Sequence, residues 1–238
     1  MDSTEANQNK ASSYLLMINL AEQLKLPFMQ IQRQAELIRL TGKQDISSIE
    51  TSADYALKLI DNYLLGLKLN QDKMALEQEP VSVAAVLYDS GQLLDRLAKK
   101  YGVKLELNIS GKYEPVMAHK QGLESALVSL GTSLIEAAGV QNTPKCSLQL
   151  ATHRCRYGIV AGVYSNNPGL TTDLLRQGRK LIGSARQPLV NLTYSAGAGI
   201  FVADSILKAM SLSLKASRHH RLYGIGAVMR GNQQLQLV

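Results

Sequence analysis

The sequence predicts an α+β protein in which an antiparallel helical hairpin precedes an α/β sandwich. Apolar residues recur every three or four positions through the first third of the chain, which is the period of an amphipathic helix. Beyond residue 100, apolar and polar residues alternate in several short runs, which is the period of a half-buried strand. We therefore expect a disordered N-terminus over 1–12, the helical hairpin over 13–76 and the sandwich over 77–238.

The apolar positions of the two hairpin helices follow a seven-residue rhythm that is typical of helical bundles. In the first helix they are Met17, Leu20, Leu24, Phe28, Ile31, Ala35 and Ile38, and in the second they are Ile46, Ile49, Ala53, Ala56, Ile60, Tyr63 and Leu67. We expect Gly42 to end the first helix, because glycine readily adopts the left-handed backbone found at helix C-termini. A lone hairpin cannot bury both stripes, so we expect two copies to form a homodimeric four-helix bundle.

The second part of the chain is expected to fold as a mixed sheet covered by helices. Ser82 is a suitable N-cap for a helix over 83–100, and the alternating residues of 103–109 predict the first strand. The remaining elements are expected in this order: a helix at 119–138, strands at 147–151 and 157–163, helices at 171–181 and 198–210, and strands at 211–216 and 223–229.

Composition indicates a globular protein without a membrane-spanning segment. Of the 238 residues, 45% are hydrophobic and 19% are charged, and no apolar run approaches the roughly 20 residues that a membrane-spanning helix needs. The polar N-terminus lacks the basic and apolar regions of a signal peptide. Cys146 and Cys155 either face each other on paired strands or, as we favour for an intracellular protein, stay reduced. We expect a soluble cytoplasmic protein without a metal site.

The formal net charge of +7 is concentrated in the second part of the chain. The first 76 residues contain 8 Lys or Arg and 9 Asp or Glu, whereas the remaining residues contain 18 and 10. The excess would attract a nucleotide, an acidic partner or nucleic acid, but we favour a solvated basic surface, because no aromatic residues interleave with the charges. Nucleic acid and membranes are therefore not expected partners. The residues of the nucleic-acid alternative are Arg176, Arg179, Lys180, Arg186, Lys208, Lys215, Arg218 and Arg221.

The segment AEQLKLPFMQI in the first helix resembles the phosphoacceptor motif H-E-L-R-T-P-L of bacterial sensor histidine kinases. When the two are aligned on Pro27, the proline and Leu24 are shared, whereas Glu22 stands at the position of the phosphorylated histidine. All four histidines of the chain lie after the hairpin, so the resemblance implies a hairpin without a phosphoacceptor. Two interpretations of Glu22 stay open. Its carboxylate mimics the charge of phosphohistidine, or it is an ordinary solvated residue, which its helix propensity favours.

The order of elements after residue 77 is similar to that of the ATP-binding domain of histidine kinases and of gyrase-type and Hsp90-type ATPases. In these families an asparagine holds Mg²⁺, an aspartate binds the adenine amino group, and a glycine-rich box at a helix start binds phosphate. The alignment places Ser133 at the asparagine, Ser165 at the aspartate and Ser195 at the first glycine of the box. The other aligned positions are Glu136 in place of Lys or Arg, Asn167 in place of a glycine, and the retained Gly169, Gly197 and Gly199. The resemblance implies a degenerate nucleotide site with at most weak binding of ATP and magnesium, and no other cofactor.

These features predict a catalytically degenerate histidine kinase, or pseudokinase, that acts as a signalling adaptor in a two-component phosphorelay. The resemblance implies that it binds the receiver domain of a response regulator, or a partner kinase, through the first helix just beyond Glu22. The candidate contact residues are Leu26, Met29, Gln30 and Arg33. The alternatives are a divergent active kinase or ATPase that uses Ser165, Ser195 and Glu136, and the basic nucleic-acid-binding regulator described above.

Overall fold

The chain divides into two compact units, Met1–Leu65 and Gly66–Val238. The computed structural model describes residues 2–42, 46–72, 75–109, 111–140, 146–167, 169 and 195–231. The helix expected at 171–181 therefore lies outside the described residues. None of the described helices is long and apolar enough to cross a membrane.

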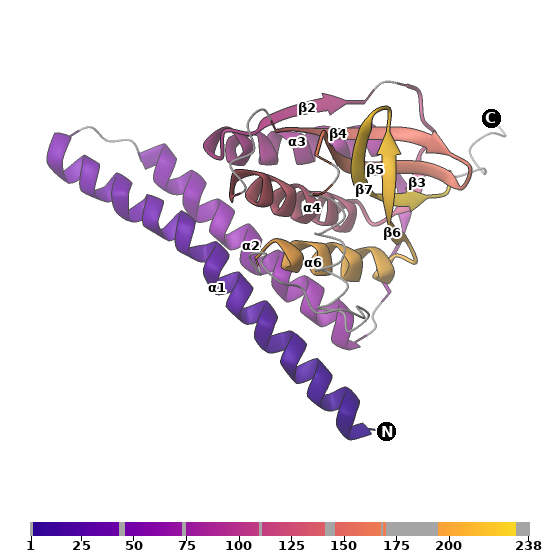
Figure 1. Ribbon diagram of the computed structural model, residues 1–238, viewed down its shortest axis with the longest axis horizontal. Coiled ribbons are helices and arrows are strands. Elements are labelled where there is room, and N and C mark those ends of the chain that lie inside the picture. The colour runs from indigo at the N-terminus through magenta and orange to yellow at the C-terminus, as the bar shows by residue number, and fades with distance from the viewer. Residues whose placement is uncertain are drawn as a thin grey trace. The chain divides into compact units, whose positions relative to one another are not determined.

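The first unit is a hairpin of two helices, α1 (Asp2–Thr41) and most of α2 (Ile46–Asp72), which run antiparallel in Figure 1. Gly42 follows α1 with a φ of +67°, and its N–H donates a hydrogen bond of 2.9 Å to the Ile38 carbonyl. This left-handed glycine ends the helix in the expected way. α1 begins at Asp2, so residues 2–12, for which the sequence predicts disorder, are helical. The Ser52 hydroxyl on α2 lies 3.4 Å from Gln30 Oε1 on α1.

The second unit contains a mixed five-stranded sheet. Its strands are β2 (Lys104–Asn108), β4 (Ser147–Cys155), β5 (Gly158–Ser165), β6 (Ser213–His219) and β7 (Leu222–Met229). They lie in the order β2-β4-β5-β7-β6, with β2 parallel to β4 and all other neighbours antiparallel. A separate antiparallel pair, β1 (Glu79–Val81) and β3 (Val116–Ala118), was not predicted, because strands of three residues are too short to show alternation.

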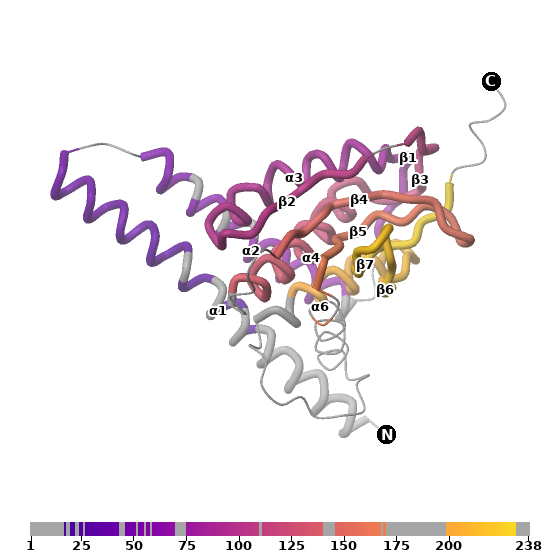
Figure 2. Tube along the Cα trace, turned by 45° about the horizontal axis from the view of Figure 1, so that its top comes forward, coloured from indigo at the N-terminus to yellow at the C-terminus, as the bar shows by residue number. Residues whose placement is uncertain are grey.

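Three helices pack against this sheet, namely α3 (Val83–Lys100), α4 (Lys120–Val140) and α6 (Ser195–Ala209) (Figure 2). The Ser82 hydroxyl accepts a hydrogen bond of 3.4 Å from the Ala85 N–H, so Ser82 caps α3 as predicted. Alternate residues of the sheet face the helices and are fully buried with them. This core contains Leu87, Leu94, Leu123, Leu127, Leu130, Leu134, Leu148, Leu150, Val163 and Ile225.

The sheet curls steeply at its far end, where β6 and β7 stand nearly across β4 and β5 in Figure 1. Glycines on two central strands permit this close backbone approach. A Cβ on Gly162 would lie 2.5 Å from the Ile225 carbonyl oxygen, and a Cβ on Gly226 would lie 2.9 Å from the Ala161 carbonyl oxygen. The curl brings side chains of β4, β5 and β6 together on the face of the sheet that points away from α3 and α4.

Candidate functional site

The position that the alignment gives to the magnesium ligand lies where α4 and α6 pack directly together. Ser133 on α4 is 0% exposed, and a Cβ on Gly199 of α6 would overlap Ser133 Oγ and lie 2.6 Å from the Ser129 carbonyl oxygen. Ser133 Oγ has no hydrogen-bond partner among the described residues. The Ser133 hydroxyl is thus buried in the contact between α4 and α6.

The residues aligned with the adenine-binding box stabilise a loop that follows β5. Ser165 is 0% exposed, and its hydroxyl accepts a hydrogen bond of 3.0 Å from the Asn167 N–H. Asn167 Oδ1 in turn accepts a hydrogen bond of 3.1 Å from the Gly169 N–H. Such local bonds from Ser and Asn side chains to the backbone are typical of turns. Ser165 and Asn167 thus hold the loop in shape, and Ser165 presents no carboxylate for an adenine amino group.

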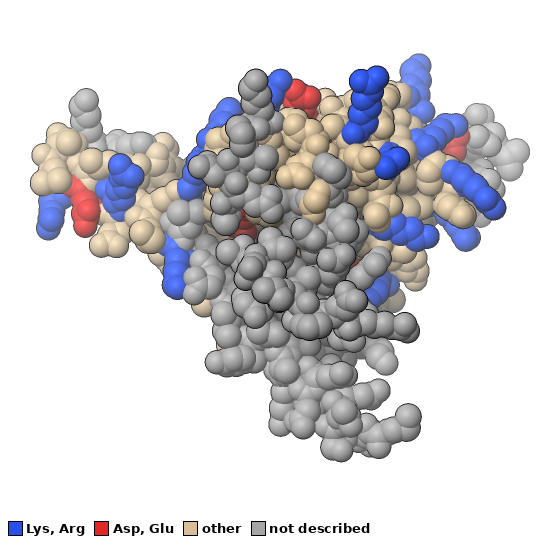
Figure 3. All heavy atoms as spheres, viewed as in Figure 1, with Lys and Arg blue, Asp and Glu red and all other residues tan. Residues whose placement is uncertain are grey.

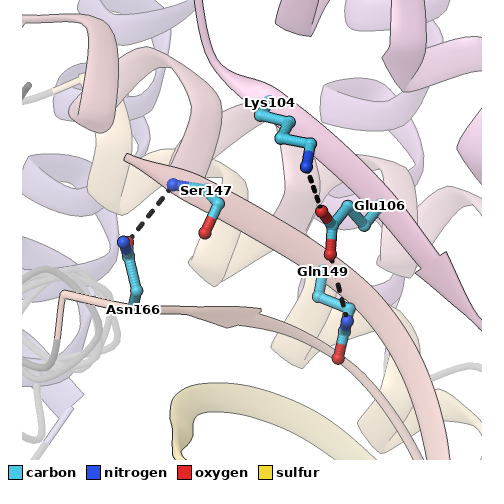
Figure 4. A network of polar contacts seen from close by, with 5 residues as sticks. All are labelled: Lys104, Glu106, Ser147, Gln149 and Asn166. Carbon is cyan, nitrogen blue, oxygen red and sulfur yellow. Dashed lines mark hydrogen bonds and ion pairs between the residues drawn. The ribbon is translucent and has the colours of Figure 1, made fainter. Parts of the chain in front are cut away.

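The same loop is hydrogen-bonded to the start of β4, as Figure 4 shows. Asn166 Oδ1 accepts a hydrogen bond of 3.2 Å from the Ser147 N–H at the start of β4. One row further along, Glu106 of β2 accepts from Gln149 of β4 and forms an ion pair of 2.6 Å with Lys104. The first contact ties the loop to β4, and the second links the paired strands β2 and β4.

The two cysteines do not pair. Cys155 ends β4 and Cys146 precedes its first residue, so the thiols lie at opposite ends of one strand, and both are free. The alternative of a bridge between paired strands is therefore wrong. Cys146 is buried, and its sulfur lies 3.9 Å from Ser165 Oγ beneath the loop.

Glu136 lies on α4 three residues after Ser133, so the two side chains are neighbours on the helix surface. Glu136 is buried, and its charge acts on Lys100 and Tyr101 at the end of α3. Burial lowers the pKa of Lys100, and the nearby Glu136 carboxylate opposes this shift. Burial and the Glu136 carboxylate both raise the pKa of Tyr101. The carboxylate of Glu136 thus acts electrostatically on the end of α3.

The remaining aligned residues lie at helix positions. Ser195 and Gly197 fall in the first turn of α6, ahead of the contact that Gly199 makes. Glu22 and Leu26 lie within α1, and their side chains are outside the described set. Among the candidate docking residues, Met29 is 65% exposed and Arg33 is exposed, whereas Gln30 is half-buried.

Two histidines come together on the curled sheet, an arrangement that the sequence does not predict. His220 is exposed with a φ of 52°, whereas its neighbour His219 is only 6% exposed. The rings of His153 and His219 lie 5.2 Å apart, and each lies within 5.8 Å of the Tyr164 ring. We call these three residues the histidine cluster. It joins the β4–β5 hairpin to β6, which lies about 50 residues further along the chain, so no local sequence pattern predicts it.

Polar contacts complete the histidine cluster. Tyr164 Oη lies 3.3 Å from His153 Nδ1, and Ser217 Oγ lies 3.4 Å from His153 Nε2. Asn108 Nδ2 lies 3.2 Å from His219 Nε2. Burial lowers the pKa of both histidines, and the neighbouring His220 adds to this effect. Within the described part of the chain, no group of three or more His, Cys, Asp or Glu side chains has the arrangement of a metal site.

Comparison with known proteins identifies the fold. No protein-family model and no curated protein matches the sequence. The Acinetobacter baumannii histidine kinase AdeS is similar over 88% of this chain and 98% of its own, with 13% identity and a TM-score of 0.50. The structure of full-length ShkA in complex with AMPPNP is similar over 91% of this chain and 46% of its own, with 15% identity and a TM-score of 0.55. The chain has the fold of a histidine kinase catalytic core.

This likeness confirms the α+β class and the mixed sheet with its helices, which the sequence predicts. It does not extend to a four-helix bundle, which stays a prediction. Within the kinase-like fold, the structure brings Ser133 and Gly199 together at the α4–α6 contact. It brings Ser165 and Asn167 together in the loop after β5. Neither group presents a charged side chain to a nucleotide.

Proposed function

We propose that the chain is a catalytically degenerate, histidine kinase-like signalling adaptor. It dimerises through its helical hairpin and binds a response regulator receiver domain or a partner kinase of a two-component pathway. The observation that carries this proposal is the buried Ser133 hydroxyl beneath Gly199, at the position where a kinase of this fold holds its magnesium ion.

The loss of charge at the aligned site supports the proposal energetically. A hydrogen bond to a charged group contributes about 1.5–3 kcal/mol, so the exchange of the adenine-binding carboxylate for Ser165 weakens binding by about one to two decades. Serine in place of the metal ligand at Ser133 leaves the triphosphate charge poorly neutralised. The hairpin contains no histidine, so neither half of the phosphotransfer reaction has its usual group.

The hairpin carries apolar side chains that favour association with a second copy. The exposed ones on α1 and α2 are Met17, Phe28, Met29, Leu37, Leu40, Ile46, Leu57 and Leu64. Met17, Phe28 and Ile46 belong to the seven-residue stripe that predicts a bundle. Exposed apolar residues gathered on one small unit are typical of an interface. Met29 and Arg33, about two and three turns beyond Glu22, would then remain available to a receiver domain.

We expect no saturable binding of ATP with magnesium at concentrations up to about 1 mM, which corresponds to a binding free energy weaker than about −4 kcal/mol. The measurement is isothermal titration calorimetry of the full chain with ATP and Mg²⁺. Ser133→Asn together with Ser165→Asp tests whether the missing groups are the cause, since any gain in affinity must come from them. A micromolar dissociation constant for the unchanged chain would contradict the proposal and favour a divergent active kinase.

We expect the chain to be a dimer in solution and Phe28→Glu to shift it to a monomer, because a carboxylate in the apolar stripe would be buried without a partner. Light scattering coupled to size exclusion measures the mass. Leu107→Glu is the matched control, since Leu107 is also an exposed apolar residue but lies on β2 of the second unit. A monomer at every concentration, or equal effects of both variants, argues against the bundle.

A further inference from the structure

The two hairpins at the curled end of the sheet carry only positive charge. Residues 146–165, which contain β4 and β5, and residues 211–231, which contain β6 and β7, include no Asp or Glu. Their basic residues are Arg154, Arg156, Lys215, Arg218, Arg221 and Arg230, and all six are exposed. Figure 3 shows Lys and Arg side chains gathered on the right of the view, over these strands. Such a surface attracts polyanions.

Tyrosine rings lie among these cations. Tyr157, in the turn between β4 and β5, is 63% exposed, with the Arg156 guanidinium 5.5 Å and Lys215 Nζ 5.3 Å from the ring centroid. On the neighbouring hairpin, the Arg218 guanidinium lies 4.3 Å from the Tyr223 ring centroid and donates a hydrogen bond of 2.7 Å to its hydroxyl. Tyr157, Arg156 and Lys215 form what we call the basic–aromatic surface. Arg218 and Tyr223 form a second cation–ring pair on the other face of the β6–β7 hairpin, because successive side chains of a strand point to opposite faces.

We propose that the basic–aromatic surface binds single-stranded nucleic acid. Lys and Arg side chains neutralise the phosphates, and an unpaired base stacks on the exposed ring of Tyr157, beside Arg156 and Lys215. An acidic peptide would use the positive charge but offers no bases for the rings, and a duplex keeps its bases stacked inside. The fold thus brings a distant cation, Lys215, beside an aromatic ring, Tyr157, which the sequence analysis does not predict. This activity is separate from the hairpin and goes beyond the adaptor function.

The first test measures binding of a fluorescently labelled oligothymidine of 20 nucleotides to the full chain by anisotropy. We expect a dissociation constant in the micromolar range at low salt. The logarithm of the affinity should fall with the logarithm of salt concentration by about 0.7 for each phosphate contacted, giving a slope near −3 for about four contacts. An oligonucleotide of equal length with abasic sites keeps the phosphates and removes the bases. We expect it to bind about tenfold more weakly, because each stacked base contributes about 1–3 kcal/mol.

Matched variants separate the surface from general charge. Tyr157→Ala should weaken binding about tenfold, whereas Tyr88→Ala should not, although Tyr88 on α3 is similarly exposed at 54%. Arg156→Gln with Lys215→Gln should reduce both the affinity and the salt slope. Lys99→Gln with Lys120→Gln removes the same charge from exposed positions on α3 and α4 and should have the smaller effect. All six positions are on the surface, and unchanged circular dichroism will show that each variant folds.

The proposal is overturned by any of three results. The first is no binding of the oligonucleotide at low salt. The second is equal affinity for the intact and abasic oligonucleotides, or competition by polyglutamate at equal charge concentration, both of which would indicate a surface for acidic polymers in general. The third is equal loss of affinity in the matched variants, which would assign the binding to net charge alone.

Discussion

Gly199→Ala is expected to lower the free energy of unfolding by about 2 kcal/mol, even though alanine is the better helix former. The added Cβ would overlap Ser133 Oγ and lie 2.6 Å from the Ser129 carbonyl oxygen. The serine hydroxyl can rotate, but the carbonyl belongs to the backbone of α4 and cannot move without shifting the helix. Urea unfolding of the full chain, followed by circular dichroism, measures the change.

Two further variants serve as controls for Gly199→Ala. Gly122→Ala, on α4, places its Cβ no closer than 3.2 Å to side-chain atoms of Leu76, so we expect a small effect or a slight gain from helix propensity. Ser133→Ala removes a buried hydroxyl without a described partner and should raise stability by about 1 kcal/mol. If Gly199→Ala lowers the free energy of unfolding by no more than Gly122→Ala does, α4 and α6 do not pack closely around Ser133. The main support for the degenerate site is then lost.

Much of the fold could be predicted from the sequence, because its signals are local. The Ser82 cap and the amphipathic pattern after it place α3 at Val83–Lys100, which agrees with the expected 83–100. Gly42 ends α1 where a left-handed residue was expected. By contrast, β1 and β3 are each three residues long and pair with each other across α3 and β2, so no window along the chain contains their signal.

The alignment predicts which residue types occupy the candidate site, but it does not predict how those residues are packed in the fold. That Ser133 replaces an asparagine is visible in the sequence, whereas its burial beneath Gly199 depends on the packing of two helices. The basic–aromatic surface and the histidine cluster have the same origin. Lys215 meets Tyr157, and His219 meets His153, only through the curl of the sheet, which glycines of β5 and β7 permit. Both features depend on contacts between distant strands, and such contacts cannot be predicted from composition and periodicity.

Acid is expected to destabilise the second unit through the histidine cluster. The pKa values of His153 and His219 are lowered in the folded chain, mainly by burial, so the unfolded chain binds protons at a higher pH than the folded one. The free energy of unfolding is therefore highest above the ordinary histidine pKa of about 6.5 and falls as the pH drops through it towards the folded-state values. Strands β4 to β7 offer no carboxylate to stabilise an imidazolium, and Glu106 on β2 is paired with Lys104.

Urea unfolding at a series of pH values between 7.5 and about 5 measures this dependence. His153→Gln with His219→Gln should flatten it, because glutamine keeps hydrogen-bonding groups near Tyr164, Ser217 and Asn108 but does not titrate. His119→Asn is the control. His119 Nδ1 accepts a hydrogen bond from the Gly122 N–H at the start of α4, a role that an asparagine oxygen also fills, and the residue lies outside the histidine cluster. The cluster is the source of the acid sensitivity only if the control keeps the wild-type slope while the double variant loses it.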